Sequence, residues 1–146
     1  MTKPLSAAMR QEVARRANHC CSYCRSQEQV AGMLFTVDHI IPQALGGSDD
    51  LDNLCLAWWD CNPIKQAHVT GIDPSSGNRV PLFHPHRQRW LDHFAWDQDG
   101  AVVVGTTEVG RATVEQLQLN RAFLVRARRQ WIRVGWHPPV NMSDAP

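Results

Sequence analysis

The stretch that decides the fold is VDHIIPQALGGSDDLDNLCLAWWDCNPIK, residues 37–65. The residues just before Asp38 are strand formers, so an extended segment is expected to deliver Asp38 and His39 at its end. Pro42 and the Gly46-Gly47 pair then predict a loop. A second short strand is expected at 53–57 and a short helix from Asp60 to about residue 67, because Pro is tolerated in a first helical turn.

The polar residues of this stretch suggest a reaction at a negatively charged phosphate ester. Asp38 can bind a hard cation through oxygen, and Asn62 offers a second, neutral oxygen ligand. His39 can take a proton from water near neutral pH. Successive residues of a strand project to opposite sides, so Asp38 and His39 can take different tasks. The set predicts metal-assisted cleavage of a phosphodiester, with Lys65 available to meet a phosphate.

The order and spacing of these residues resemble those of the HNH endonuclease family. The matching segments are Cys21-Ser-Tyr-Cys24, Asp38-His39-Ile40-Ile41-Pro42, Gly46-Gly47, Asn53-Leu54 and Cys61-Asn62-Pro63-Ile64-Lys65. The resemblance is strong over residues 19–67. Residues 72–139 look similar to the tail of a bacterial subgroup of these proteins. The chain departs from the family pattern at position 58, where Trp58 stands in place of a Cys.

The resemblance implies a ββα-metal unit that hydrolyses DNA. It makes His39 the general base, and it makes Asp38 and Asn62 the ligands of a divalent cation, Mg²⁺ or Mn²⁺. Asn53 corresponds to the Asn that braces the loop, and Lys65 stands where many relatives have a third His. An ammonium cannot ligate a metal, so Lys65 is expected to contact phosphate instead. The alternative is a non-catalytic DNA-binding module that keeps the fold.

Whether the chain also holds a structural Zn²⁺ is left open by Trp58. A structural zinc site wants four ligands, and Cys21, Cys24 and Cys61 supply three. One alternative is that Trp58 fills the space as core and the three thiols are merely buried, and this is the alternative we favour from the sequence. The other is that Cys55, Cys20 or His19 completes the site.

The remaining half predicts a hairpin-plus-helices extension. Asp97-Gln-Asp-Gly100 is the strongest hairpin signal, and helices are expected at 109–118 and 121–134. On a helical wheel of the last segment, one side is apolar, formed by Phe123, Leu124, Ala127, Trp131 and Val134. The other side carries arginines expected to meet DNA phosphates: Arg121, Arg126, Arg129 and Arg133. The tail from Trp136 is expected to fray.

Bulk properties place the whole chain in one class. With an N-terminal helix at 6–18 in front of the unit, we expect one α+β domain over 1–146, with core 19–67 and extension 72–139. Five Cys without a signal-peptide pattern favour a cytoplasmic protein with reduced thiols. No membrane segment is expected.

The net charge of +1 is uninformative, but residues 38–60 carry five Asp and no Lys or Arg, and residues 111–133 carry six Arg and one Glu. The sequence leaves oligomeric state undetermined.

Overall fold

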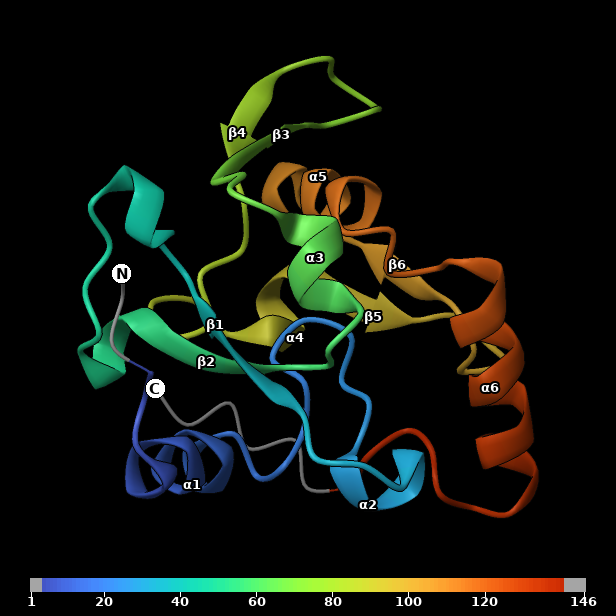
Figure 1. The fold of residues 1–146 in the computed structure, drawn as a ribbon. Coiled ribbons are helices and arrows are strands. Elements are labelled where there is room, and N and C mark those ends of the chain that lie inside the picture. Colours follow the sequence, from blue (N-terminus) through green and yellow to red (C-terminus); the bar gives the residue numbers. More distant parts are fainter. Residues whose placement is uncertain (1–3, 141–146) are drawn as a thin grey trace.

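The computed structural model describes residues 4–140, which fold into helices and three separate two-stranded antiparallel sheets (Figure 1). The α+β fold class is therefore confirmed. The α-helices are α1 (Ala7–Arg16), α2 (Glu28–Ala31), α3 (Cys61–Lys65), α4 (Trp90–His93), α5 (Glu108–Gln116) and α6 (Ala122–Arg133). The strands are β1 (Thr36–His39), β2 (Leu54–Ala57), β3 (Thr70–Ile72), β4 (Arg79–Pro81), β5 (Phe94–Trp96) and β6 (Val103–Gly105).

The first helix begins where the sequence indicates. Ser6 caps α1, because its hydroxyl accepts a hydrogen bond from the backbone N–H of Met9 at 3.1 Å. Val13 and Ala14 are buried on its inner face, and α1 packs against β2. A turn that holds Cys21 and Cys24 then leads toward β1.

Strands β1 and β2 form the central hairpin of the predicted unit. Asp38 lies opposite Cys55 and His39 lies opposite Leu54 in the register. All four residues of β2 are buried, so this strand is core on both faces. The connecting loop contains two short 3₁₀ turns, Gln43–Leu45 and Leu51–Asn53, and helix α3 follows β2 after Trp58-Trp59-Asp60.

The extension contains two hairpins. Strands β3 and β4 pair around the turn at Asp73–Asn78, and β5 and β6 pair around the predicted turn at 97–100. The segment before that turn is extended only from Phe94 onward, because residues Trp90–His93 form the single helical turn α4. Trp90 explains this, because it is fully buried, stacks on Phe94 with centroids 5.0 Å apart and donates its indole N–H to the Tyr23 carbonyl at 3.0 Å.

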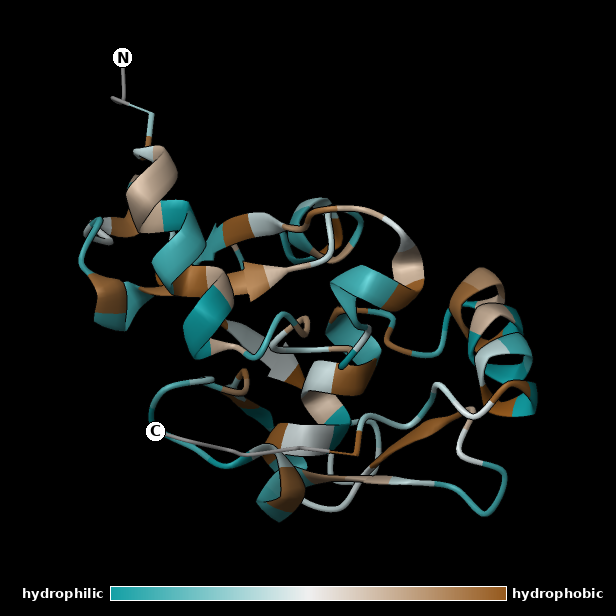
Figure 2. Cartoon of the chain, turned by 90° about the horizontal axis from the view of Figure 1, so that it is seen from below, coloured by the Kyte–Doolittle hydropathy of each residue, from teal (hydrophilic) through white to brown (hydrophobic). Residues whose placement is uncertain are grey.

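Helix α6 differs from its predicted wheel. Leu124 is buried as expected, but Phe123 is 72% exposed and Val134 is 57% exposed. The buried face turns instead toward Arg128, which has no exposed surface. The buried residues of α6 thus include both an apolar and a charged one. Figure 2 shows hydrophobic (brown) and hydrophilic (teal) residues mixed on this helix.

The C-terminal tail also departs from expectation. His137 is 5% exposed, contacts the Trp96 ring at 4.5 Å between centroids, and its Nε2 lies 3.0 Å from the Gly100 carbonyl. The described tail is therefore packed on the β5–β6 turn up to His137 rather than frayed. Among the helices of residues 4–140, none is both long and apolar enough to cross a membrane.

Candidate functional site

Strand β1 sends Asp38 and His39 to opposite sides, as the strand period requires. Asp38 is 3% exposed and points into the protein, whereas the side chain of His39 keeps 21% of its surface exposed. One residue is therefore enclosed and its neighbour faces solvent. Their different surroundings suit different chemical tasks.

The Asp38 carboxylate is surrounded by donors. Tyr23 donates its hydroxyl to Oδ2 at 2.7 Å, and Lys65 Nζ lies 3.1 Å from the same oxygen. Burial raises the pKa of the Asp38 carboxyl, although the Lys65 charge and the Tyr23 hydrogen bond act in the opposite direction. Lys65 is what keeps this carboxylate compatible with a buried position.

Lys65 itself is placed differently from the sequence expectation. It is 2% exposed, and its ammonium also donates to the backbone carbonyls of His39 at 3.1 Å and Ile40 at 3.3 Å. An ammonium with these partners is turned inward, and a contact between Lys65 and phosphate stays a prediction. This placement has a simple cause, because the buried Asp38 needs a nearby cation.

His39 has a carboxylate partner that the sequence did not single out. Its Nε2 lies 2.8 Å from Asp49 Oδ1, and the Gln43 amide also donates to this oxygen at 3.1 Å. The hydrogen bond from His39 lowers the pKa of the Asp49 carboxyl. An ionised Asp49 accepts, so His39 carries its proton on Nε2 and keeps its lone pair on Nδ1. The turn at 46–50 brings the chain back to the end of β1 and so places Asp49 beside His39.

Asn53 braces that loop on three sides. Its Oδ1 accepts from the Ile41 N–H at 2.9 Å, and its Nδ2 donates to the carbonyls of Ile41 at 3.0 Å and Ser48 at 2.8 Å. Gly47 makes the approach possible, because a Cβ there would lie 1.7 Å from the Ile41 carbonyl oxygen. The position expected for Asn53 is thus observed, and its action on His39 is through the backbone.

Asn62 stands at the first turn of α3, next to β1. Its Nδ2 donates to the Val37 carbonyl at 3.3 Å, which leaves the amide oxygen as its ligating atom. Carboxylate and amide oxygens are the ligands that Mg²⁺ and Mn²⁺ prefer, so Asp38 and Asn62 have suitable chemistry for such an ion. Lys65 competes with an ion for the same carboxylate.

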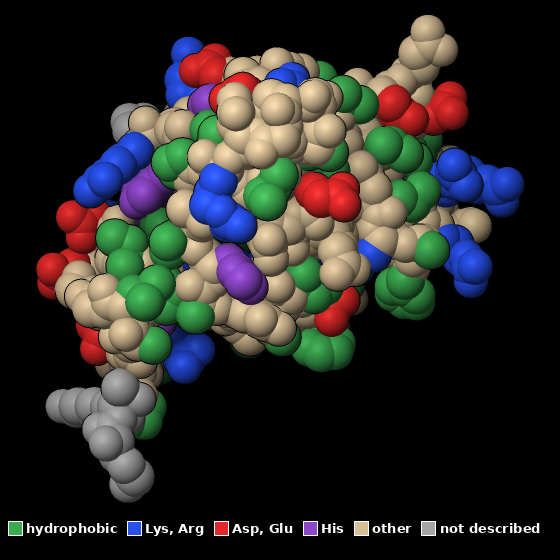
Figure 3. Space-filling model, turned by 90° about the horizontal axis from the view of Figure 1, so that it is seen from above, with side chains coloured by type: hydrophobic (Ala, Val, Ile, Leu, Met, Phe, Trp, Pro, Cys, Tyr) green, Lys and Arg blue, Asp and Glu red, His purple; other side chains and the backbone are tan. Residues whose placement is uncertain are grey.

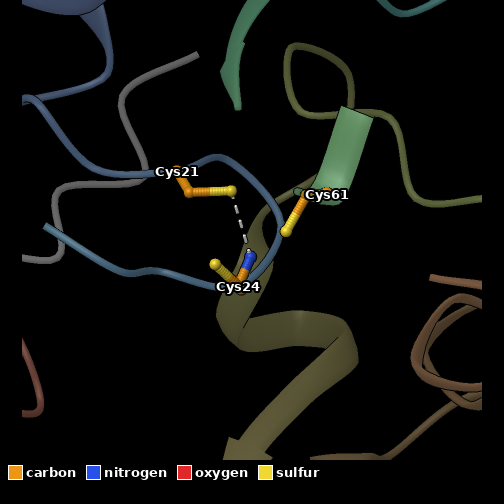
Figure 4. Close-up of side chains that lie close together, drawn as sticks. All are labelled: Cys21, Cys24 and Cys61. Atoms are coloured by element: carbon orange, nitrogen blue, oxygen red, sulfur yellow. Dashed lines mark hydrogen bonds between the residues drawn. The ribbon is translucent and has the colours of Figure 1, made fainter. Parts of the chain in front are cut away.

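Three thiols converge on the other side of α3. The sulfurs of Cys21, Cys24 and Cys61 all lie within 4.8 Å of one another, and all three residues have no exposed surface (Figure 4). The Cys24 N–H donates to Cys21 Sγ at 3.5 Å. Burial raises the pKa of Cys21 to about 12. Burial acts to raise the pKa of Cys24, but its hydrogen bonds with the other two thiols and with Ser26 together bring that pKa well below its usual value.

Trp58 packs as core beside this thiol cluster, which is the first half of the favoured alternative; its second half, that the thiols hold no zinc, stays a prediction. It is 8% exposed and stacks on Phe35 with ring centroids 5.9 Å apart. Arg121 lies over the Trp58 ring, and its guanidinium donates to Cys61 Sγ at 3.4 Å and pairs with Asp60 at 3.1 Å. The expectation that Arg121 faces DNA is therefore not supported by its position.

Arg128 is the residue that sequence reasoning missed. It is fully buried, donates through Nη1 to the Ala101 carbonyl at 3.1 Å, and leaves Nε and Nη2 without a hydrogen-bond partner. Burial lowers the pKa of Arg128, and the nearby negative charge of Cys24 opposes this. A buried guanidinium is stabilised by an anion, and ionisation of the neighbouring thiol cluster would supply one. Three thiolates around one Zn²⁺ would carry a net charge of −1 and would match it.

The three other arginines of the predicted basic face are at the surface. Arg126, Arg129 and Arg133 are exposed on α6. Helix α6 lies on the opposite side of the molecule from the β1 end that carries His39 (Figure 1). The structure thus does not bring this face together with the Asp38–His39 pair.

Comparison with known proteins locates a family within the chain. Residues 21–68, about a third of the chain, match the family model described as HNH endonuclease. Curated proteins and solved structures give no match to the chain. The matched range contains Asp38, His39, Asn53 and Asn62 together with the three clustered Cys. The match supports a nuclease or a DNA-binding protein. Residues 21–68, called the HNH unit below, are therefore the part of the chain that matches the HNH endonuclease family, and a C-terminal extension follows them.

Proposed function

We propose that the chain is a metal-dependent endonuclease that hydrolyses DNA phosphodiester bonds. The observation that carries the proposal is the geometry of β1, which buries Asp38 and leaves His39 accessible and oriented by Asp49. His39 takes a proton from the attacking water through Nδ1, and the ionised Asp49 stabilises the imidazolium that results. Asn53 holds the loop, and with it the partner of His39.

Asp38 and Asn62 would hold a divalent cation, with Mg²⁺ or Mn²⁺ the suitable ions. Such an ion supplies charge neutralisation at the scissile phosphate and at the leaving oxygen. The ammonium of Lys65 fixes the position of the Asp38 carboxylate and partly offsets its negative charge. Exposed arginines, Arg126, Arg129 and Arg133, are available for phosphates at a distance from the site.

The test is nicking of supercoiled plasmid with Mg²⁺ or Mn²⁺, with and without EDTA. We expect His39→Ala to lower the cleavage rate by about 10²–10⁴-fold, the usual contribution of a general base, while DNA binding persists. His19→Ala is a matched control, because His19 is also paired to a carboxylate, Glu28, but lies outside the site. Cleavage that survives excess EDTA, or an alanine variant at His39 with wild-type turnover, would refute the proposal.

A second function, DNA binding without cleavage, is favoured by one observation. Lys65 already occupies the carboxylate to which a catalytic ion would bind. In that case the protein binds DNA equally well with and without divalent ions, and no nicking occurs with any of them. The plasmid assay, run beside a binding assay, distinguishes the two functions.

We propose also, against the alternative favoured from the sequence, that Cys21, Cys24 and Cys61 supply three of the four ligands of a structural zinc ion. The support is the closeness of the three sulfurs and the uncompensated Arg128 beside them. Elemental analysis of the purified protein should find near one zinc per chain, and Cys61→Ser should lose it. Cys20→Ser is the control, because Cys20 is buried but lies outside the thiol cluster. A metal-free protein whose melting temperature ignores strong chelators would show that the thiols are only core.

A further inference from the structure

A pocket of about 280 Å³ opens beside the end of β1. Ile40, Ile41 and Lys65 form one wall, and all three belong to the HNH unit. Residues beyond the matched range form the facing wall, among them Val69 and, from the extension, Leu82 and Phe83. We call this the extension pocket, because the HNH unit alone would leave it open on one side.

The extension pocket adjoins the proposed catalytic residues. Ile40 directly follows His39 in the chain, and the ammonium of Lys65 bonds the carbonyls of both. A chain of nucleotides that places one phosphate at His39 therefore has its neighbouring nucleotide beside this pocket. No comparable cavity is needed for the hydrolysis itself.

The polar lining of the pocket suits an anion. Its polar side chains include His68, His84 and Arg87, and no Asp or Glu lines it. The acidic loop at 49–52 does not line the pocket, although the charge of Asp52 acts on His84. Figure 3 shows the face seen from above, where His side chains (purple) reach the surface beside Lys and Arg side chains (blue). A phosphate in the pocket therefore meets cationic and neutral side chains, with no carboxylate among the residues that line it.

His84 is set up to donate. Its Nδ1 accepts the His86 N–H at 3.2 Å, so in the neutral ring the proton is on Nε2. Partial burial lowers the pKa of His84, and the charges of Arg87 and His86 act in the same direction. At neutral pH, His84 is therefore a neutral donor and Arg87 at the rim is the permanent charge.

The apolar walls and the size restrict the occupant. Branched and aromatic side chains such as Ile41, Val69 and Phe83 offer a flat, water-excluding contact of the kind on which a base packs. A volume of about 280 Å³ is near the lower limit of small-molecule sites, roughly 300–1,000 Å³. That is room for one nucleotide and far too little for a duplex.

We propose that the extension pocket holds one unstacked nucleotide of the DNA strand next to the scissile phosphodiester, with its base on the apolar wall and its phosphate on Arg87. This inference rests on the proposed function, because it takes DNA as the substrate. It makes the extension a reader of locally unpaired DNA. Selectivity follows, because a nucleotide that is already unpaired avoids the unstacking free energy.

The experiment measures binding of the full-length protein in EDTA, so that it does not depend on cleavage. A short labelled duplex, fully paired, is compared by fluorescence anisotropy with the same duplex carrying one bulged nucleotide. We expect the bulged duplex to bind about tenfold tighter or better, since unstacking a base requires a few kcal/mol. Arg87→Gln should lose about tenfold of that affinity. Arg89→Gln, an exposed neighbour that does not line the pocket, should lose little.

A second variant tests the pocket by volume rather than charge. Val69→Trp should fill the cavity and reduce the affinity for the bulged duplex to that for the paired one. Val104→Trp, at another exposed Val on β6, is its control. Equal affinity for both duplexes, or equal effects of Arg87→Gln and Arg89→Gln, would overturn the pocket proposal and leave the nuclease proposal intact. A protein that binds neither duplex would overturn both the pocket proposal and the nuclease proposal, because DNA would then not be its substrate.

Discussion

Lys65 Nζ lies 3.1 Å from Asp38 Oδ2, and the two side chains keep only 3% and 4% of their surface exposed. This is the one buried Lys–Asp pair within residues 4–140, and it joins β1 to α3. A buried pair contributes little when complete but is strongly destabilising when one partner is removed. The same pair decides how a metal ion can reach Asp38.

Replacement of Lys65 should reveal this dependence. In Lys65→Met the Asp38 carboxylate loses its counter-ion, and we expect the free energy of unfolding to fall by about 3–5 kcal/mol without divalent ions. Added Mn²⁺ should restore stability in the variant more than in the wild type, because the ion replaces the lost charge. Thermal melts with and without Mn²⁺ measure both effects. Arg15→Met, which breaks an exposed pair with Glu12, is the control and should change little. A Lys65→Met protein as stable as wild type in EDTA would contradict the role given to Lys65.

The adjacent tryptophans at 58 and 59 offer a matched pair. Trp58 is 8% exposed and stacked on Phe35, whereas Trp59 is 51% exposed. Trp58→Ala should lower the free energy of unfolding by about 3–5 kcal/mol, the usual effect of truncating a buried aromatic. Trp59→Ala should have a much smaller effect. Chemical denaturation of both variants measures these changes. Similar losses of unfolding free energy at the two positions would show that Trp58 is not part of the core.

The exposed arginines of α6 can be tested by salt dependence. If Arg126 and Arg129 contact phosphates, replacing both with Gln should reduce the log–log salt slope of DNA binding by roughly one to two units. Arg10 and Arg16 on α1, replaced in the same way, provide the control. An unchanged slope in the α6 variant would make this face an ordinary solvated surface. Arg121 is left out, because its guanidinium is engaged with Asp60 and Cys61.

His137 predicts a pH dependence of stability. Burial, with the Arg128 charge in second place, lowers the pKa of His137 to about 4 in the folded protein, from 6.5 in a free side chain. Between these values the unfolded chain binds a proton that the folded chain does not. The free energy of unfolding should therefore decrease as pH falls from about 6.5 to 4, by up to about 3 kcal/mol. His137→Gln should flatten the dependence in this window. Identical pH profiles for the two proteins would mean that His137 does not contribute.

The order of elements was predictable because local signals mark them. Pro42, the Gly46-Gly47 pair and the turn at 97–100 interrupt the chain where the structure does, and alternation along a strand separates Asp38 from His39. These are properties of short segments, which a sequence expresses directly.

What escaped prediction depends on contacts between segments. Asp49 is ten residues from His39, and only the closed loop brings it within 2.8 Å. Lys65 was expected to contact phosphate because an ammonium cannot ligate a metal, and its pairing with the buried Asp38 was not foreseen. The wheel of α6 assigned burial by hydropathy alone, so it placed Phe123 inside and overlooked Arg128, whose burial depends on the thiol cluster beside it.

The indole of Trp90, which donates to the Tyr23 carbonyl from far along the chain, has a consequence for dissecting the protein. Tyr23 is also the donor to Asp38, so a fragment that ends at residue 68 would lose the support beneath the side chain that orients the carboxylate. We expect such a fragment to be cut readily by proteases. We also expect residues 21–68 to fold poorly when they are fused to another protein. We therefore expect the smallest piece that folds to extend past residue 68 and to include Trp90.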